Sequence, residues 1–311
     1  MKLSKLCSIA LLVISGGTAV LSAVQLVPYI REEAQSASTY RELAAFFSGK
    51  DVALEDVLNN PSGSFNPHGA SDGDAVEMDS SEEEALLSDG DANELMEDSM
   101  NGADDENEAA EDGALTWQSD PEAASRLQAL HEKNSDCVAW IRIDDTAINY
   151  PVMYRPQSKN YYLHRDFYGK KSSSGALYIS EICNPDTSDN VIIYGHHMNS
   201  GAMFAALNKY KKKSFYEDHK HIVLQTLHGT EVYEIIFALT TPVYTGKDFK
   251  YYAFANAHNT REFDAYVSNC RARALYDTDV TAQYGDRLLT LSTCEYSQRN
   301  GRMLVVAKKV N

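Results

Sequence analysis

A cysteine and an arginine stand close together near the end of this 311-residue chain, in the stretch TLSTCEYSQRNGRMLVVAKKV, where they are Cys294 and Arg302. The thiolate of cysteine is a nucleophile, and a nearby guanidinium favours that form and offers permanently charged donors to an oxyanion or a carbonyl. A thiol nucleophile also needs a group that moves protons, and the stretch NVIIYGHHMNSGAMF supplies His196 or His197 after an apolar run. Together these residue types suit covalent catalysis by cysteine.

Short strands must position these residues. The alternation in RLLTLSTC ends at Cys294 and RMLVVAKKV resumes at Arg302, so we expect the seven residues between them to form a loop joining antiparallel strands. Residues opposite each other in such a pair lie about 5 Å apart, which predicts that Cys294 and Arg302 meet at the mouth of a hairpin. Further strand-like segments are CVAWIRI, INYPV, GALYIS, NVIIYG, HIVLQT and VYEIIFALTTPVY. About eight short strands with few long helices predict a closed barrel or a sandwich and disfavour a parallel α/β fold.

Two helices accompany the strands. In DPEAASRLQALHEKNSD, Asp120 can cap and Pro121 suits the first helical position, before apolar residues at helical spacing. In NTREFDAYVSNCRARALYD, Asn259 can cap with Glu262 three residues on, and an aromatic stripe follows that we expect to pack in the core.

The N-terminal third has a different composition. Residues 6–30 carry no charge and are long enough to cross a bilayer as a helix, at about 20 residues needed. Lys2 and Lys5 precede this run, which predicts a cytoplasmic N-terminus and an extracytoplasmic chain beyond; a cleaved signal peptide is the alternative.

An acidic stretch follows. Between Asp51 and Glu122 there are 23 Asp and Glu and no Lys or Arg, against a net charge of −17 for the whole chain. Such a composition predicts a disordered, extended linker, with a cation-binding or partner-binding tail as the alternative. The predicted division is residues 1–5 cytoplasmic, 6–30 membrane anchor, 31–50 juxtamembrane, 51–117 acidic linker and 118–311 catalytic domain.

The remaining cysteines show no CxxC pair or metal spacing, and a disulfide between Cys183 and Cys270 stays open. A metal site on the adjacent His196 and His197 is disfavoured, because neighbouring residues on one loop rarely point at one ion and no further ligand pattern accompanies them.

Three stretches resemble, in order and separation, the His, Cys and Arg motifs of the sortases: VIIYGHHM, TLSTCEY and GRMLVVAKKV. A fourth stretch resembles the segment that opens the sortase barrel: WIRIDDTAINYPVMY. The helix before the first strand, the segment YYLHRDFYGKKSSSGALYIS and the helix near residues 260–275 resemble class B. The resemblance implies a mainly β fold, a closed eight-stranded barrel with an N-terminal helix and an extra helix between strands 6 and 7. It makes Cys294 the nucleophile, His196 the general acid and base, and Arg302 the stabiliser of the transition state, and we expect His197 to face solvent.

The resemblance also implies a reaction. A membrane-tethered cysteine transpeptidase cleaves a C-terminal sorting signal of secreted proteins through an acyl-thioester and passes them to a cell-wall amine. No cofactor, metal or nucleic acid is expected. Weaker substrate-binding candidates are Ser292, Thr293, the backbone N–H of Glu295, Tyr251 and Tyr252, with plain packing as the alternative for each. The alternative functions are a pilus-polymerising sortase that uses a lysine amine and a non-enzymatic, membrane-tethered binding protein.

Overall fold

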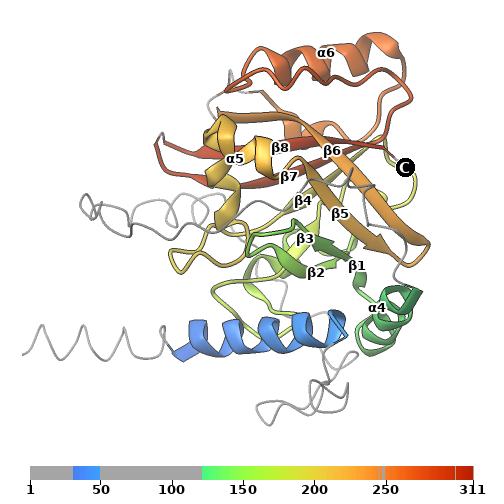
Figure 1. Cartoon of the computed structure of the whole chain (residues 1–311), viewed down its shortest axis with the longest axis vertical. Helices are drawn as coiled ribbons and strands as arrows, with labels where there is room; N and C mark the ends of the chain where they lie inside the picture. The colour runs from blue at the N-terminus through green and yellow to red at the C-terminus, as the bar shows by residue number, and fades with distance from the viewer. Residues whose placement is uncertain (1–30, 50–120, 245, 247–248, 298, 311) are drawn as a thin grey trace, which may run out of the picture.

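The strands close into one barrel, as the computed structural model of the chain shows (Figure 1). The structure describes residues 31–49, 121–244, 246, 249–297 and 299–310. The strands are β1 Cys137–Arg142, β2 Asn149–Met153, β3 Leu177–Ile179, β4 Asn190–Tyr194, β5 His221–Thr226, β6 Gly229–Pro242, β7 Leu288–Glu295 and β8 Gly301–Lys309. The predicted mainly β, closed eight-stranded barrel is confirmed.

The barrel order is β1-β2-β3-β4-β7-β8-β6-β5. Most neighbours are antiparallel, as hairpin connections favour, but β2 pairs with β3 and β4 pairs with β7 in parallel. Parallel neighbours need long connections. The β4-to-β7 connection contains the short helices η2 Ala205–Lys211, α5 Lys213–Asp218 and η3 Tyr251–Ala253, together with β5, β6 and α6 Thr260–Arg271.

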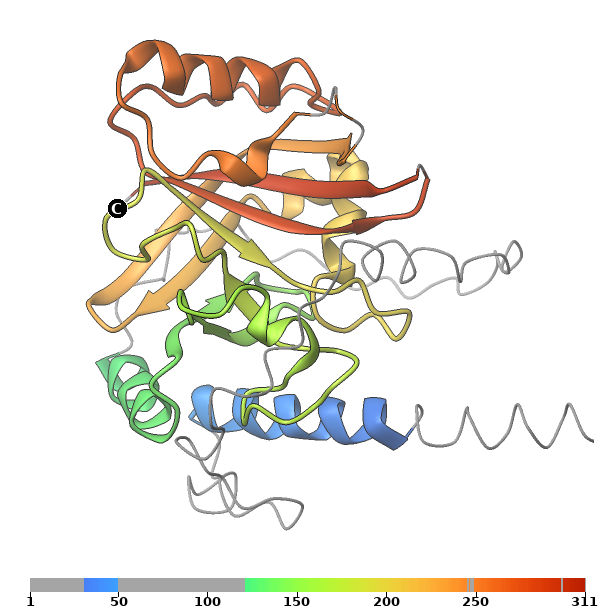
Figure 2. The ribbon, with the colours of Figure 1, turned by 180° about the vertical axis from the view of Figure 1, so that it is seen from behind.

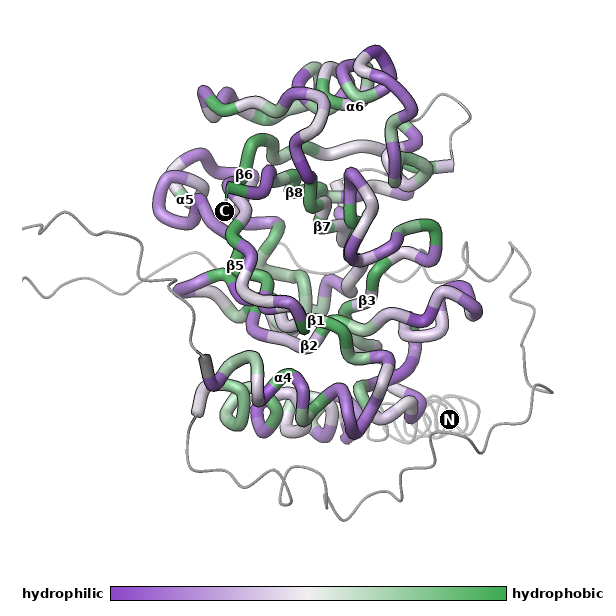
Figure 3. Tube along the Cα trace, turned by 90° about the vertical axis from the view of Figure 1, so that its right-hand side faces the viewer, coloured by the Kyte–Doolittle hydropathy of each residue, from purple (hydrophilic) through white to green (hydrophobic). Residues whose placement is uncertain are grey.

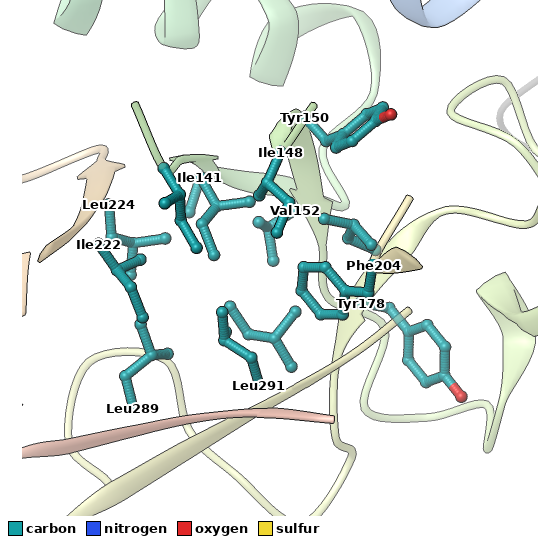
Figure 4. Packing of buried hydrophobic residues seen from close by; sticks show 14 of the residues in the cluster. Ile141, Ile148, Tyr150, Val152, Tyr178, Phe204, Ile222, Leu224, Leu289 and Leu291 are labelled. Atoms are coloured by element: carbon teal, nitrogen blue, oxygen red, sulfur yellow. The ribbon is translucent and has the colours of Figure 1, made fainter. Parts of the chain in front are cut away.

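Hydrophobic residues are concentrated on the strands, which are largely green in Figure 3, and the buried ones form two clusters. The barrel interior is filled from all sides, and Figure 4 shows Ile141, Val152, Ile222 and Leu291 converging there. The opposite face of β6, β7 and β8 is covered by α6, whose buried residues include Phe263. Side chains one residue apart on β7 therefore enter different environments.

Both predicted helices are present. The first is α4 Pro121–Lys133, and its Leu127 and Leu130 are fully buried. The second is α6, where the side chain of Asn259 accepts a hydrogen bond from the Glu262 N–H at 3.1 Å, as the capping pattern predicts. The short η1 Tyr161–His164 lies between β2 and β3.

Residues 31–47 form a further helix that packs against the barrel, drawn in blue in Figure 2. Tyr40 and Leu43 are buried in the main core, and the Tyr40 hydroxyl donates to the carbonyl oxygen of Gly175 at 2.7 Å. The ring of Phe47 stacks on Trp140 with centroids 4.2 Å apart. The predicted domain start at residue 118 thus omits a helix that fills part of the core.

The predicted anchor at residues 6–30 and the predicted linker at residues 51–117 lie outside the described residues. Within the described ranges, none of the helices has the length and apolar character needed to cross a bilayer. The four cysteines in these ranges, Cys137, Cys183, Cys270 and Cys294, are all free, so Cys183 and Cys270 form no disulfide in this structure.

Candidate active site

Cys294 and Arg302 are direct partners across the β7–β8 hairpin. Their predicted juxtaposition is confirmed, because residues opposite each other in an antiparallel pair project their side chains to the same face of the sheet, about 5 Å apart. The loop is shorter than expected: Glu295 and Gly301 also pair, which leaves residues 296–300 as the connection. Cys294 is partly exposed, whereas the other three cysteines of the described residues are buried.

The parallel pairing of β4 with β7 brings the histidine loop, residues 195–204 after β4, to the same end of β7 as Cys294. Tyr194 pairs with Ser292, and the Gly195 N–H continues this ladder by donating to the Ser292 carbonyl at 3.2 Å. A Cβ at Gly195 would lie 2.3 Å from a methyl of Leu177 and 2.7 Å from the ring of Phe204. Only glycine therefore fits between β4 and the two histidines that follow it.

His196 is held by the segment that connects β2 to β3. Its Nε2 donates to the carbonyl oxygen of Leu163 at 2.7 Å, and the ring of His164 lies beside it with centroids 5.7 Å apart. Burial lowers the pKa of His196 below its usual value, and the charges of His164 and Arg302 lower it further, against the opposing effect of the Leu163 carbonyl. Arg302 thus pairs with Cys294 across the hairpin and contributes to the electrostatic surroundings of His196.

His197 does not simply face solvent. Its ring is half-buried, its Nδ1 accepts a hydrogen bond from the Asn208 side chain, and the edge of its ring meets the ring of Tyr296. Burial lowers the pKa of His197, and the nearby carbonyl oxygen of Cys294 opposes that shift. The expectation of a solvent-facing ring failed because it ignored the partners that the fold brings from η2 and from the β7–β8 loop.

Three of the weaker candidates are enclosed by the protein. Tyr251 is 2% exposed, and its hydroxyl is hydrogen bonded to that of Ser292 at 2.8 Å. Burial raises the pKa of Tyr251 to about 12. Thr293 is 2% exposed and alternates with Cys294, so it projects to the other face of β7, with Leu291 in the barrel interior. These positions favour packing over the predicted contact with a substrate.

The other two candidates have different surroundings. The Glu295 carboxylate pairs with Lys211 at 2.5 Å and accepts from the Ser297 hydroxyl at 2.7 Å. Burial alone would raise the pKa of Glu295, but these partners hold it below its usual value. Tyr252 is half-exposed with its ring 6.0 Å from that of Tyr244, which is 60% exposed. Tyr244 and Tyr252, not Tyr251, present aromatic surface on this loop.

A cavity of about 290 Å³ lies elsewhere, between the helix at residues 31–47, β2 and the loop at residues 200–203. None of the residues that line it is Cys294, His196 or Arg302. Its size does not make it the reaction site, because it holds none of the reactive groups. In the described part of the chain, no three His, Cys, Asp or Glu side chains gather in a way that could hold a metal ion.

Comparison with known proteins identifies the family. A family model described as the sortase domain matches residues 141–310. The chain belongs to the sortase family. It is similar to sortase B of Staphylococcus aureus, with 32% identity over 188 residues that cover 59% of this chain and 74% of that protein. It is also similar to sortase B of Listeria monocytogenes, with 34% identity over 201 residues that cover 63% and 79%.

Solved structures agree with this sortase assignment. A Staphylococcus aureus sortase B–substrate complex has a TM-score of 0.55 and 29% identity, covering 60% of this chain and 86% of that one. A mutant form of Clostridium perfringens sortase B has a TM-score of 0.56 and 26% identity, covering 62% and 92%. The protein is a cysteine transpeptidase of the sortase family, most similar to class B, as its motifs predicted.

Proposed function

We propose that this sortase is held in the membrane by residues 6–30, with its catalytic domain outside, and that it joins secreted proteins to an amine of the cell wall. The main observation behind this proposal is the pairing of Cys294 with Arg302, whose charge also lowers the pKa of His196. The charge-free run between Lys5 and Arg31 supports the anchor. The C-terminal sorting signal of the secreted protein is the proposed first substrate.

The proposed chemistry has two halves. The Cys294 thiolate attacks the scissile carbonyl carbon, and Arg302 stabilises the negative charge that develops on the oxygen. Protonated His196 gives its proton to the leaving amine as the carbon–nitrogen bond breaks, which leaves an acyl-thioester. The acceptor amine then attacks that thioester, neutral His196 takes its proton, and the Cys294 thiolate leaves as the new amide forms.

Two observations support His196 over His197 in this role. The Leu163 carbonyl accepts from Nε2 of His196 and so fixes its ring, whereas His197 is hydrogen bonded to Asn208. Because burial lowers the pKa of His196, its protonated form at neutral pH is a minor one.

The acceptor is proposed from chemistry and from one relative. A solved sortase B structure is described as complexed with triglycine, a peptide that begins with a primary amine. A cell-wall peptide amine is therefore the proposed acceptor here, and a pilin lysine is the competitor that an experiment must separate.

The test uses residues 31–311, so that the helix at residues 31–47 is kept. Peptides carrying several sorting motifs are offered together with triglycine or with a lysine-bearing pilin peptide, and the products are weighed by mass spectrometry. Ligation to triglycine supports wall anchoring, and ligation only to the lysine peptide overturns it in favour of pilus assembly.

Cysteine variants test the nucleophile in the same assay. Cys294→Ala should abolish both cleavage and ligation, whereas Cys183→Ala should keep substantial turnover because that thiol is buried in the core. Turnover that survives in Cys294→Ala would refute the acyl-thioester route.

A further inference from the structure

The backbone carbonyl of Cys294 lies just beyond the end of the hydrogen-bonded pairing between β4 and β7. The ladder between β4 and β7 ends at the Gly195 N–H, which donates to the Ser292 carbonyl at 3.2 Å. In a parallel ladder the next donor along β4, two residues on, would serve the carbonyl of Cys294. The chain instead turns away, and His197 forms an isolated bridge with Met203.

Two side chains, those of His197 and Asn208, lie near the carbonyl of Cys294 where the next backbone donor of β4 would be. The Asn208 Nδ2 donates to the carbonyl oxygen of Cys294 at 3.5 Å, and the His197 imidazole lies close enough to the same oxygen for it to raise the pKa of the ring. Asn208 Nδ2 also donates to the His197 ring, so the two side chains form one hydrogen-bonded unit. On the side away from β8, beyond the end of the β4 ladder, the carbonyl of Cys294 thus faces the amide of Asn208 and the imidazole bonded to that amide.

The short helix η2 holds the next residue of β7 as well. Asn208 and Lys211 stand three residues apart in this 3₁₀ helix, and side chains at that spacing eclipse one another on one face. Lys211 forms its ion pair with Glu295, while Asn208 reaches Cys294. One face of η2 therefore contacts two successive residues of β7, the nucleophile and the residue after it.

Asn208 is an unfavourable residue for packing alone. Its Oδ1 is buried and makes no hydrogen bond to any described residue. A buried polar atom without a partner lowers stability, and an apolar side chain of similar shape would avoid that loss. The amide is therefore better explained by what its NH₂ group holds than by the stability it gives.

We propose that His197 and Asn208 are positioning residues that fix the carbonyl of Cys294 and thereby aim its side chain at the scissile bond. This inference rests on the proposed role of Cys294 as the nucleophile. The peptide plane after Cys294 sets the direction of its Cα–Cβ bond, and the strand ends one residue later, before the loop at residues 296–300. A displacement of about 1 Å at a reacting atom is enough to cost on the order of 100-fold in rate.

Four substitutions in the full chain test the proposal. Asn208→Leu keeps the volume but removes the donors, and Asn199→Leu makes the same change at an exposed position of the histidine loop as the matched control. His197→Gln keeps an N–H donor, whereas His197→Leu does not. Single-turnover acylation, KM and thermal melting are measured for each.

Asn208→Leu should lower acylation roughly 10- to 100-fold with KM within about threefold and a melting temperature that stays the same or rises, because the unpaired oxygen is gone. His197→Gln should keep most of the rate that His197→Leu loses. A merely structural role predicts instead that rate and melting temperature fall together, and that result would overturn the proposal, as would an unchanged rate in Asn208→Leu.

Two further readouts separate the possible failures. If His197 were the acid and base, His197→Gln would lose as much activity as His197→Leu and would shift the pH profile. The charged groups that act on the His197 ring are Lys211 and Glu295. The alkylation rate of Cys294 by iodoacetamide, located by mass spectrometry, needs no substrate. If the unsubstituted protein cleaves no peptide, the proposed function fails, and the alkylation rates still test the positioning role. Equal alkylation rates in all variants would overturn that role. A slower alkylation rate in Asn208→Leu would support it.

Discussion

Leu43 lies on the helix at residues 31–47 and is fully buried against the barrel, so replacing it by alanine should destabilise the catalytic domain as a whole. Removing a buried leucine side chain typically costs about 2–5 kcal/mol, from lost burial and the cavity left behind. Leu43 is 0% exposed and belongs to the same cluster as Trp140 and Ile141, which places it inside the cooperative core.

The assay is thermal unfolding of residues 31–311, followed by circular dichroism. For a domain of this size, 1 kcal/mol corresponds to about 2–4 °C, so Leu43→Ala should lower the midpoint by roughly 4–20 °C. Gln35→Ala is the matched control, because Gln35 is exposed on the same helix and surface changes usually stay within about 0.5 kcal/mol. A Leu43→Ala shift no larger than that of Gln35→Ala would refute the packing of this helix in the core.

Arg302→Ala should slow acylation about 100-fold, near 3 kcal/mol, and Arg302→Lys should restore only part, because an ammonium lacks the planar fork; intact acylation in a folded Arg302→Ala protein would contradict its role. Burial lowers the pKa of His164, His196 and His197, so the folded state favours the neutral form of each ring. The stability that these rings contribute is therefore present above about pH 6.5, the usual pKa of histidine, and is lost as the pH falls through their lower pKa values in the folded state. Urea midpoints at pH 7.5 and pH 5 check this, and equal midpoints would contradict it. Deleting residues 72–112 should leave turnover within about twofold, since their composition lacks the apolar residues of a packed interface, and a larger loss would show that the segment docks on the domain.

The hairpin that pairs Cys294 with Arg302 could be predicted because the information is local. Two alternating segments a few residues apart can only pair in one register if their apolar faces are to coincide. The helix α6 was similarly predictable, since Asn259 and Glu262 mark its start within the segment itself. In both cases neighbouring residues determine the structure.

The surroundings of the histidines could not be predicted in the same way. Leu163, His164 and Asn208 reach His196 and His197 from η1 and η2, and no spacing pattern connects those segments. Their approach depends on two parallel strand pairs and long connections, which the alternation of single strands does not specify. As a result, the imidazole of His197 was expected in solvent, whereas it is hydrogen bonded to Asn208 and packs against Tyr296.

The helix at residues 31–47 was missed for another reason. Tyr40, Leu43 and Phe47 follow a helical spacing, but they stand between a charge-free run and an acidic one. Composition divided the chain at residue 118, whereas packing joins this helix to the barrel across that division.

The placement of that helix changes what the acidic segment can do. The chain leaves the domain beside α4, where a Cβ on Gly49 would lie 3.3 Å from a guanidinium nitrogen of Arg126, and it returns at Pro121, the first residue of the same helix. Residues 50–120 therefore close a loop on one domain and do not separate it from the N-terminal segment. Removing residues 72–112 would reduce the entropy cost of closing that loop by about 0.8 kcal/mol. If residues 6–30 are the anchor, as proposed, the helix at residues 31–47 connects that anchor to the barrel directly, and shortening the acidic segment should not change the distance from the bilayer to Cys294.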